Sequence, residues 1–202
     1  ISSFTISSSE TLTFTGCDLV FAPGVEVTVE NGGTLIINAD VNTPITPSHL
    51  FSCDGMWQGI TVKAGGILNL DGYVSGTNNY CKIENAVEAV YGNGNGALLN
   101  APEININHLT FNNNLVPIKL SEDDFGSSVI TANIFECDGD YLTKSPHIGV
   151  YPQQHILLED VTGIHIGGSG NALNSFYDIY VGIKAIRSSL LVTNSEFVNL
   201  KN

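Results

Sequence analysis

One motif recurs along the chain and constrains its fold more than any other feature. Each copy starts with a large apolar residue, has Asn or Asp two places later, and has another apolar residue seven places later. Full copies start at Ile83, Phe111 and Phe176, and partial copies start at Phe135 and Phe197, so the intervals are 28, 24, 41 and 21 residues. The interval of 41 fits either two repeats or one repeat with an insertion. Repeats of this length without helical periodicity predict a solenoid of strands.

The segments between these motifs alternate apolar and polar residues and break at glycines. Residues 25–37 read V-E-V-T-V-E-N-G-G-T-L-I-I, and residues 60–70 read I-T-V-K-A-G-G-I-L-N-L. This period-two pattern with tight turns predicts short strands. A unit of three short strands cannot bury its own apolar face, but stacked units can. Asn at a fixed corner suits such a stack because it tolerates left-handed backbone geometry.

We therefore expect an all-β fold, a parallel β-helix (β-solenoid) with coils of roughly 20–28 residues. A β-propeller or sandwich remains an alternative, but it predicts hairpins every ~8–12 residues, and the best two-residue hairpin candidate is residues 93–96. We expect a single domain over 1–202, with an N-terminal cap or first coil at 1–24 and a loop insertion at 41–55. Trp57 is expected to anchor that loop on the core.

The two ends of the sequence suggest a piece of a longer protein. The chain begins at Ile1 rather than Met, and it stops within a strand-like pattern. We therefore expect that a leader has been removed and that the C-terminal end is truncated from a longer chain, whose other domains would be partners of this one. An open last coil near Val192 to Leu200 would alternatively allow end-to-end self-association.

The charge balance limits the ligands that this chain can attract. It has 7 Lys and Arg against 20 Asp and Glu, a formal net charge of −13. Nucleic acid and anionic lipid are excluded as electrostatic partners, and a polyanionic polysaccharide would need a bridging cation. No uncharged apolar run approaches the ~20 residues of a membrane span, so we expect no membrane insertion.

The four cysteines, Cys17, Cys53, Cys81 and Cys137, form no C-x-x-C pair and have no His at metal-ligand spacing. A zinc site is therefore not expected. An even number of cysteines in a Gly- and Asn-rich chain favours disulfides over catalytic thiols. Four cysteines allow three pairings, and the spacing does not choose among them.

Three stretches resemble a known family. V-x-V-x-V-x-N-G-G-x-L-x-I at 25–37, C-x-G-M-W-Q-G-I-x-V at 53–62 and I-E-N-A at 83–86 resemble the right-handed parallel β-helix repeats of secreted surface proteins of the Bacteroidetes type, within the pectin-lyase-like superfamily. The resemblance is close over 17–90 and continues by repeat pattern alone. It implies a right-handed β-helix and export to the cell surface or medium. It also implies a disulfide between Cys17 and Cys53, which leaves Cys81 and Cys137 as the other pair.

The superfamily contains polysaccharide lyases and hydrolases as well as adhesins and stalks, so the resemblance does not fix an activity. A lyase needs a Lys or Arg base, and the best pair here is Lys184 with Arg187, three residues apart. Lys119 and Lys184 occupy the same repeat position and are expected to share one outer face. Tyr177 and Tyr180, with Lys119, are candidate sugar contacts.

Acidic clusters supply the candidate cation ligands: Glu122, Asp123 and Asp124 in one cluster, and Asp138 and Asp140 in another. Such carboxylates suit Ca²⁺, but in connecting loops they are more often simply solvated. No other cofactor is expected. Because no catalytic group is assembled in the sequence, we expect a non-enzymatic secreted or cell-surface β-helix, a stalk, adhesin or filament-like scaffold that touches glycans. The alternative is a polysaccharide lyase or glycoside hydrolase.

Overall fold

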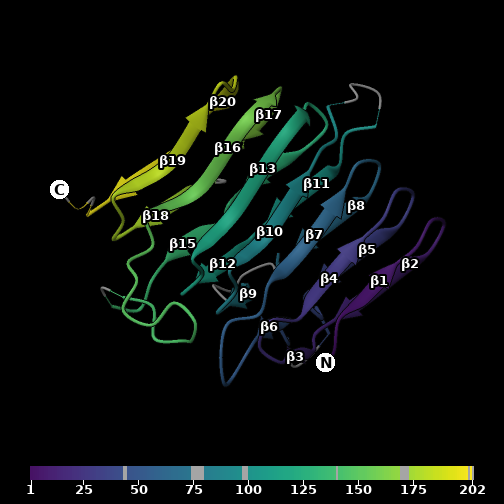
Figure 1. The fold of residues 1–202 in the computed structure, drawn as a ribbon, viewed down its shortest axis with the longest axis horizontal. Helices are drawn as coiled ribbons and strands as arrows, with labels where there is room; N and C mark the ends of the chain where they lie inside the picture. The colour runs from purple at the N-terminus through teal and green to yellow at the C-terminus, as the bar shows by residue number, and fades with distance from the viewer. Residues whose placement is uncertain are drawn as a thin grey trace.

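The computed structural model is a right-handed parallel β-helix (Figure 1). It describes residues 1–42, 45–73, 80–96, 100–139, 141–168, 173–199 and 201. Each coil contributes one strand to each of three sheets, and every sheet has seven strands paired in parallel. Within these ranges no helix is long and apolar enough to cross a membrane.

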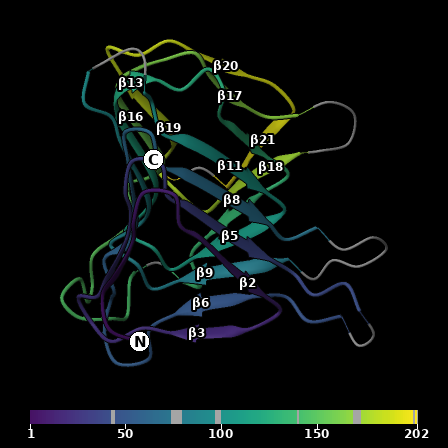
Figure 2. The ribbon, with the colours of Figure 1, turned by 90° about the vertical axis from the view of Figure 1, so that its right-hand side faces the viewer.

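The three sheets, here named A, B and C, run side by side along the stack of coils; Figure 2 shows sheet A on one side and sheets B and C converging on the other. Sheet A contains β1 (Phe4–Ile6), β4 (Glu26–Val29), β7 (Gly59–Lys63), β10 (Glu88–Asn93), β13 (Val116–Asp124), β16 (Gln154–Thr162) and β19 (Val181–Ile186). Sheet B contains β2 (Thr11–Thr15), β5 (Thr34–Asn38), β8 (Ile67–Asp71), β11 (Glu103–Asn107), β14 (Val129–Thr131), β17 (Ile164–Ile166) and β20 (Leu190–Val192). Sheet C contains β3 (Asp18–Val20), β6 (His49–Phe51), β9 (Cys81–Glu84), β12 (Leu109–Asn112), β15 (Ile134–Glu136), β18 (Asn174–Tyr177) and β21 (Ser195–Val198).

The repeat anchors form one inward-facing column of sheet C. The strand register pairs residues 19, 50, 83, 111, 135, 176 and 197 in succession. The last four are phenylalanines whose rings stack with centroids 5.1, 4.7 and 4.8 Å apart. Phe135 pairs directly with Phe176, so the interval of 41 residues is one coil with an insertion. Three of the six intervals exceed the expected 28 residues, because loops between strands vary in length.

The predicted asparagine corner is confirmed. Asn85, Asn113, Asp178 and Asn199 follow the sheet C strands and adopt φ values of 57°, 55°, 51° and 54°. Asn and Asp enter this left-handed region more readily than other non-glycine residues. The corner therefore explains why the motif keeps Asn or Asp two places after its anchor.

A small residue stands at the second position of three sheet A strands, directly before the core position. Ala89, Pro117 and Gly182 each precede an inward apolar residue of the A ladder. At Gly182 a Cβ atom would lie 2.3 Å from the Phe197 ring, so the site has no room for a side chain. His155 takes this place in the coil with the insertion, and its ring lies against Phe135 and Phe176.

The predicted loop at 41–55 is partly wrong. Residues 49–51 form β6, which completes the C strand of the second coil. Its apolar signal is a single inward Leu50, too short to show as alternation. Trp57 behaves as expected: it is fully buried, its ring stacks on Phe21 at 4.2 Å, and its Nε1 donates to the Glu84 carbonyl oxygen at 2.9 Å. The first 24 residues contain a complete coil, β1 to β3, rather than a separate cap.

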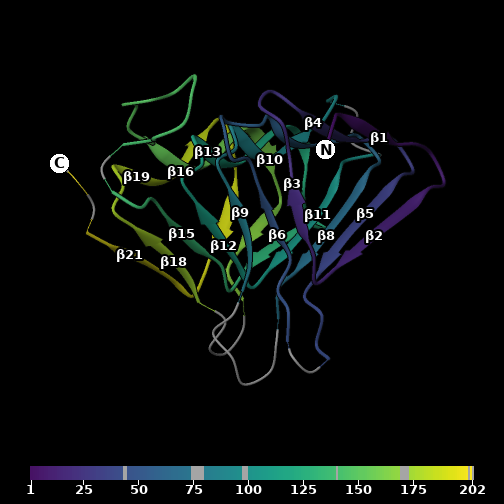
Figure 3. The ribbon, with the colours of Figure 1, turned by 90° about the horizontal axis from the view of Figure 1, so that it is seen from below.

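The insertion between β15 and β16 folds back toward the early coils (Figures 1 and 3). The Met56 amide donates to the Ser145 carbonyl oxygen at 2.8 Å, and Lys144 Nζ donates to the Cys53 carbonyl oxygen. Met56 also packs with Cys137 and Leu142 in a small apolar cluster outside the main core. The insertion therefore connects the fifth coil to the loop that follows β6.

Candidate functional site

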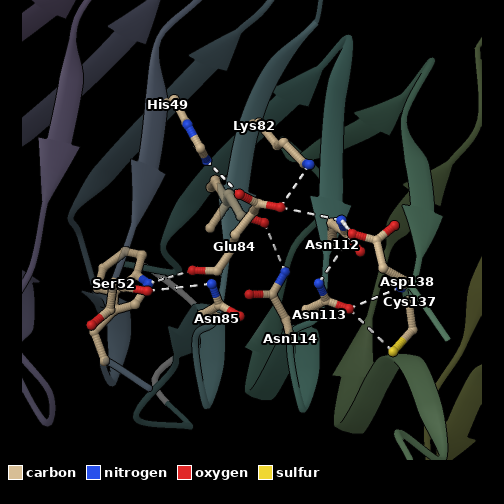
Figure 4. A network of polar contacts seen from close by, with 12 residues as sticks. His49, Ser52, Lys82, Glu84, Asn85, Asn112, Asn113, Asn114, Cys137 and Asp138 are labelled. Carbon is tan, nitrogen blue, oxygen red and sulfur yellow. Dashed lines mark hydrogen bonds and ion pairs between the residues drawn. The ribbon is translucent and has the colours of Figure 1, made fainter. Parts of the chain in front are cut away.

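A charged network lies on the outer face of sheet C, centred on Glu84 (Figure 4). Strand alternation turns Lys82 and Glu84 outward from β9, and parallel pairing places His49 of β6 opposite Lys82. Glu84 Oε2 lies 2.6 Å from His49 Nε2, and Glu84 Oε1 lies 2.6 Å from Lys82 Nζ. The three side chains therefore join two neighbouring coils.

The surroundings of Glu84 hold it in its ionised form. Partial burial opposes ionisation, but the bonds from His49 and Lys82 outweigh it and lower the pKa of Glu84 to about 2. A carboxyl group that accepts hydrogen bonds on both oxygens, one of them from a lysine ammonium, is stabilised in its ionised form. Glu84 is consequently unsuited to donate a proton at neutral pH.

Three consecutive asparagines extend the network toward the C-terminal coils. Asn112 Nδ2 donates to Glu84 Oε1 at 3.2 Å and to Asp138 Oδ2 at 2.6 Å. Asn113 Oδ1 accepts the Asp138 backbone amide at 2.9 Å. Asn114 is buried and bonds two backbone groups of the preceding coil, at 2.8 and 2.9 Å. The run thus cross-links three successive coils.

Glu136, on β15, is the second carboxyl group in this region. Burial, followed by the nearby Asp138 carboxylate, raises the pKa of Glu136 above its ordinary value. Two carboxyl groups with pKa values shifted in opposite directions occur in acid–base sites. Both oxygens of Glu84, however, are already engaged by His49, Lys82 and Asn112, so the arrangement acts as a cross-link between coils.

The structure separates the two candidate lyase residues. Arg187 lies in the turn after β19 and pairs with Asp160 through two hydrogen bonds of 2.6 and 2.7 Å. Lys184 faces outward from β19 beside Tyr180. Because Arg187 is committed to a carboxylate of the preceding coil, the two cations do not form one site.

The candidate sugar contacts also divide between faces. Tyr177 lies on sheet C, where its hydroxyl donates to Glu196 at 3.3 Å. Tyr180 lies in the turn before β19 and contacts Tyr151. Lys119 and Lys184 do share the outer face of sheet A, in register two coils apart through Leu157. Lys119 Nζ lies 3.0 Å from Glu88 Oε1 and over the ring of Tyr91. Lys119 is therefore in an earlier coil than either Tyr177 or Tyr180.

The acidic clusters do not assemble a metal site among the residues that the structure describes, where no group of three or more His, Cys, Asp or Glu side chains is placed to hold an ion. Asp123 is buried and accepts the Asp124 amide, while Asp124 accepts the Gly126 amide. Glu122 is exposed and has φ 61°. All three residues of this cluster lie within β13, so the expected position in a connecting loop is wrong. Asp138 bonds Asn112 and Asn113, and Asp140 lies outside the described residues.

Both predicted disulfides are wrong, because the residues that the structure describes include all four cysteines and no disulfide joins any two of them. Cys17 and Cys81 lie at the amino ends of sheet C strands, whereas Cys53 and Cys137 follow the carboxyl ends of others. Each predicted pair is therefore separated by about the length of a strand, roughly 13 Å for four residues. A disulfide needs Cα atoms within about 7 Å.

Ser48 sits between Cys17 and Cys81 in the stack. Its hydroxyl accepts the Cys17 amide at 3.3 Å, and its own amide donates to Cys81 Sγ at 3.2 Å. Burial of Cys81 raises the pKa of its thiol to about 11. The thiol is therefore protonated at neutral pH and packs as a small apolar side chain.

Two groupings were not predicted from the sequence. The Glu84 network needed the register between β6, β9 and β12, although the outward alternation of Lys82 and Glu84 in a strand was a usable signal. The cluster of Tyr141, Tyr151 and Tyr180 brings the insertion against the turn before β19. No local sequence pattern predicts this contact, because the tyrosines are far apart in the sequence.

Comparisons with protein-family models, with curated proteins and with solved structures found no match for this chain.

Proposed function

We propose that the chain is a non-enzymatic, rigid β-helical scaffold of an exported surface protein, of the stalk, adhesin or filament-like kind that the sequence resembles. One observation supports it most. Four side-chain pairs on the outer faces of the sheets each join two neighbouring coils: Lys63 with Glu30, Lys119 with Glu88, Arg187 with Asp160, and Glu84 with His49.

Such pairing fits a stiff rod better than an enzyme. An active site needs groups whose hydrogen-bonding capacity is open to a substrate, whereas these groups satisfy one another. Pairs between exposed side chains each contribute little to stability, typically about 0–1 kcal/mol. Their common direction along the stack nevertheless resists sliding of one coil on the next, in addition to the three backbone ladders.

The last coil supports association with further coils. Phe197 ends the aromatic stack and is 43% exposed, and Val192, which ends the inward column of Ile130 and Ile166 in sheet B, is 41% exposed. Paired strands and an apolar end face favour the addition of another coil. We propose that the parent chain supplies it, with head-to-tail contact between copies as the other arrangement. Sedimentation velocity over a hundredfold range of concentration separates the two, since only self-association depends on concentration.

Incubation with polysaccharides tests the absence of catalysis. The purified chain is mixed with neutral and uronate-containing polysaccharides, with and without calcium, and new reducing ends and unsaturated products are measured. We expect no cleavage. Cleavage that disappears in Glu84→Gln or Lys184→Ala, while a Lys63→Ala control retains it, would overturn the scaffold proposal in favour of a lyase or hydrolase.

A further inference from the structure

The outer face of sheet A carries a groove between the last two coils. It has a volume of about 530 Å³ and is lined by Gln153, Gln154, Tyr180, Val181 and Lys184. Gln154 and Val181 are paired across β16 and β19, so the floor of the groove is the sheet itself. Its wall is the turn between β18 and β19, which carries Tyr180.

Tyr180 lines this groove, and its ring packs against the ring of Tyr151. Tyr180 is 46% exposed, and its ring meets Tyr151 at 4.7 Å and 62°. Tyr151 is fixed in turn, because its hydroxyl donates to the Asp178 carbonyl oxygen and Lys201 Nζ lies 4.7 Å from the centre of its ring. The ring of Tyr141 also contacts that of Tyr151, with centroids 6.1 Å apart and an interplanar angle of 87°. The Tyr180 ring is thus a supported, open platform.

Lys184 differs from the other cations of sheet A. Lys63 and Lys119 face outward from the same sheet and pair with Glu30 and Glu88. In the part of the chain that the structure describes, Lys184 has no ion-pair or hydrogen-bond partner, although the protein carries 20 acidic residues. Its ammonium group therefore has its donors open toward the groove.

These groups fit one ligand chemistry. An exposed aromatic ring stacks on the apolar face of a sugar ring, while amide and ammonium groups at its edge bind hydroxyl oxygens. The glutamine amides supply both donors and acceptors, as a polyhydroxylated ligand requires. A proline-rich peptide would instead need a row of similarly oriented aromatic rings, and these tyrosines are mutually tilted.

We propose that this groove binds a pyranose residue of a glycan, stacked on Tyr180 and held at its edge by Gln153, Gln154 and Lys184. The inference is independent of whether the chain is catalytically inert. Neutral sugars and uronates share the ring and hydroxyl chemistry, and Lys184 would add attraction for a uronate carboxylate.

Isothermal titration calorimetry with three oligomers tests the site: xylohexaose, cellohexaose and hexagalacturonate. We expect at least one oligomer to bind with a dissociation constant below about 10 mM. Tyr180→Ala should weaken it about tenfold, while Tyr180→Phe, which keeps the ring, and the exposed control Tyr73→Ala should leave it unchanged. Lys184→Gln should weaken the binding of hexagalacturonate more than the binding of a neutral oligomer.

Three results would overturn the proposal. They are the absence of binding to all three oligomers at 10 mM, equal weakening by Tyr180→Ala and Tyr73→Ala, and tighter binding of a decaproline peptide than of any oligomer. Thermal unfolding of each variant shows that folding is retained, which is expected because Tyr180 lies at the surface. A failure here leaves the cleavage assay untouched, so the two proposals fail separately.

Discussion

His155 should make the fold sensitive to mild acid. Its side chain is almost fully buried, its ring lies 5.7 Å from that of Phe135 and 6.2 Å from that of Phe176, and Nε2 lies 3.1 Å from the Tyr177 carbonyl oxygen. Nδ1 is buried and has no hydrogen-bond partner among the residues that the structure describes. Burial therefore lowers the pKa of His155 from 6.5 to about 4, against the smaller opposing effect of the carbonyl.

The sign and size of the effect follow from the two pKa values. Because the folded-state pKa lies below the unfolded-state value, the unfolded chain takes up the proton first and acid favours unfolding. The free energy of unfolding therefore carries the full contribution of neutral His155 above pH 6.5, and this contribution is lost as the pH falls to 4. The expected loss is about 2 kcal/mol at pH 5 and about 3 kcal/mol at pH 4.

Urea unfolding at pH 7, 6, 5 and 4.5 measures this loss for the wild type and for His155→Gln. Gln keeps an amide donor at the reach of Nε2 but does not titrate. We expect the variant to lose about 2 kcal/mol less than the wild type between pH 7 and pH 5. Equal pH dependence of the two proteins would show that His155 is not held neutral by the fold.

Three other outcomes are expected. Asn174→Leu removes the buried side chain that bonds the Asn133 amide at 2.9 Å and the Ile130 carbonyl oxygen at 2.9 Å. It should cost about 1–3 kcal/mol in urea unfolding, because the Asn133 amide loses this acceptor while the Ile130 oxygen keeps the Gly167 amide at 2.7 Å; a cost below 0.5 kcal/mol would contradict the bonding. Glu84→Gln should lower stability by about 1 kcal/mol at pH 7; the difference should vanish as the pH falls from 4.5 to 2, whereas Glu30→Gln, a more exposed control, should change little at any pH. In denaturant without reductant, all four cysteines should react with iodoacetamide, as measured by intact mass. A mass that corresponds to only two alkylated cysteines would show that one disulfide is present.

The repeat and its corner could be predicted because they depend on local chemistry. An inward apolar residue and a left-handed Asn are each fixed by their own position in a coil, so Phe111 and Asn113 carry the signal in the sequence alone. The right register followed from aligning these anchors. The strand β6 could not be predicted from the sequence because Leu50 is its only buried apolar residue, between Ser48 and Ser52.

The sites were less predictable because they depend on which coils are neighbours. The wrong cysteine pairs came from sequence resemblance and ignored at which end of a strand each cysteine lies. Arg187 was placed with Lys184 by sequence distance, yet its partner Asp160 comes from the preceding coil. The tyrosine cluster requires the insertion to reach Tyr180, which depends on the packing of the insertion as a whole.

The distance between the first and last coils tests the rigid scaffold most directly. Residues 5, 28, 61, 91, 119, 157 and 184 form one outward column of sheet A, so Thr5 and Lys184 are six strand spacings apart. At about 4.8 Å per spacing their backbones lie about 29 Å apart. Spin labels carried on non-natural side chains at these two positions, read by pulsed dipolar spectroscopy, should give one narrow distribution consistent with that separation. A broad or multimodal distribution would contradict a rigid stack of seven coils.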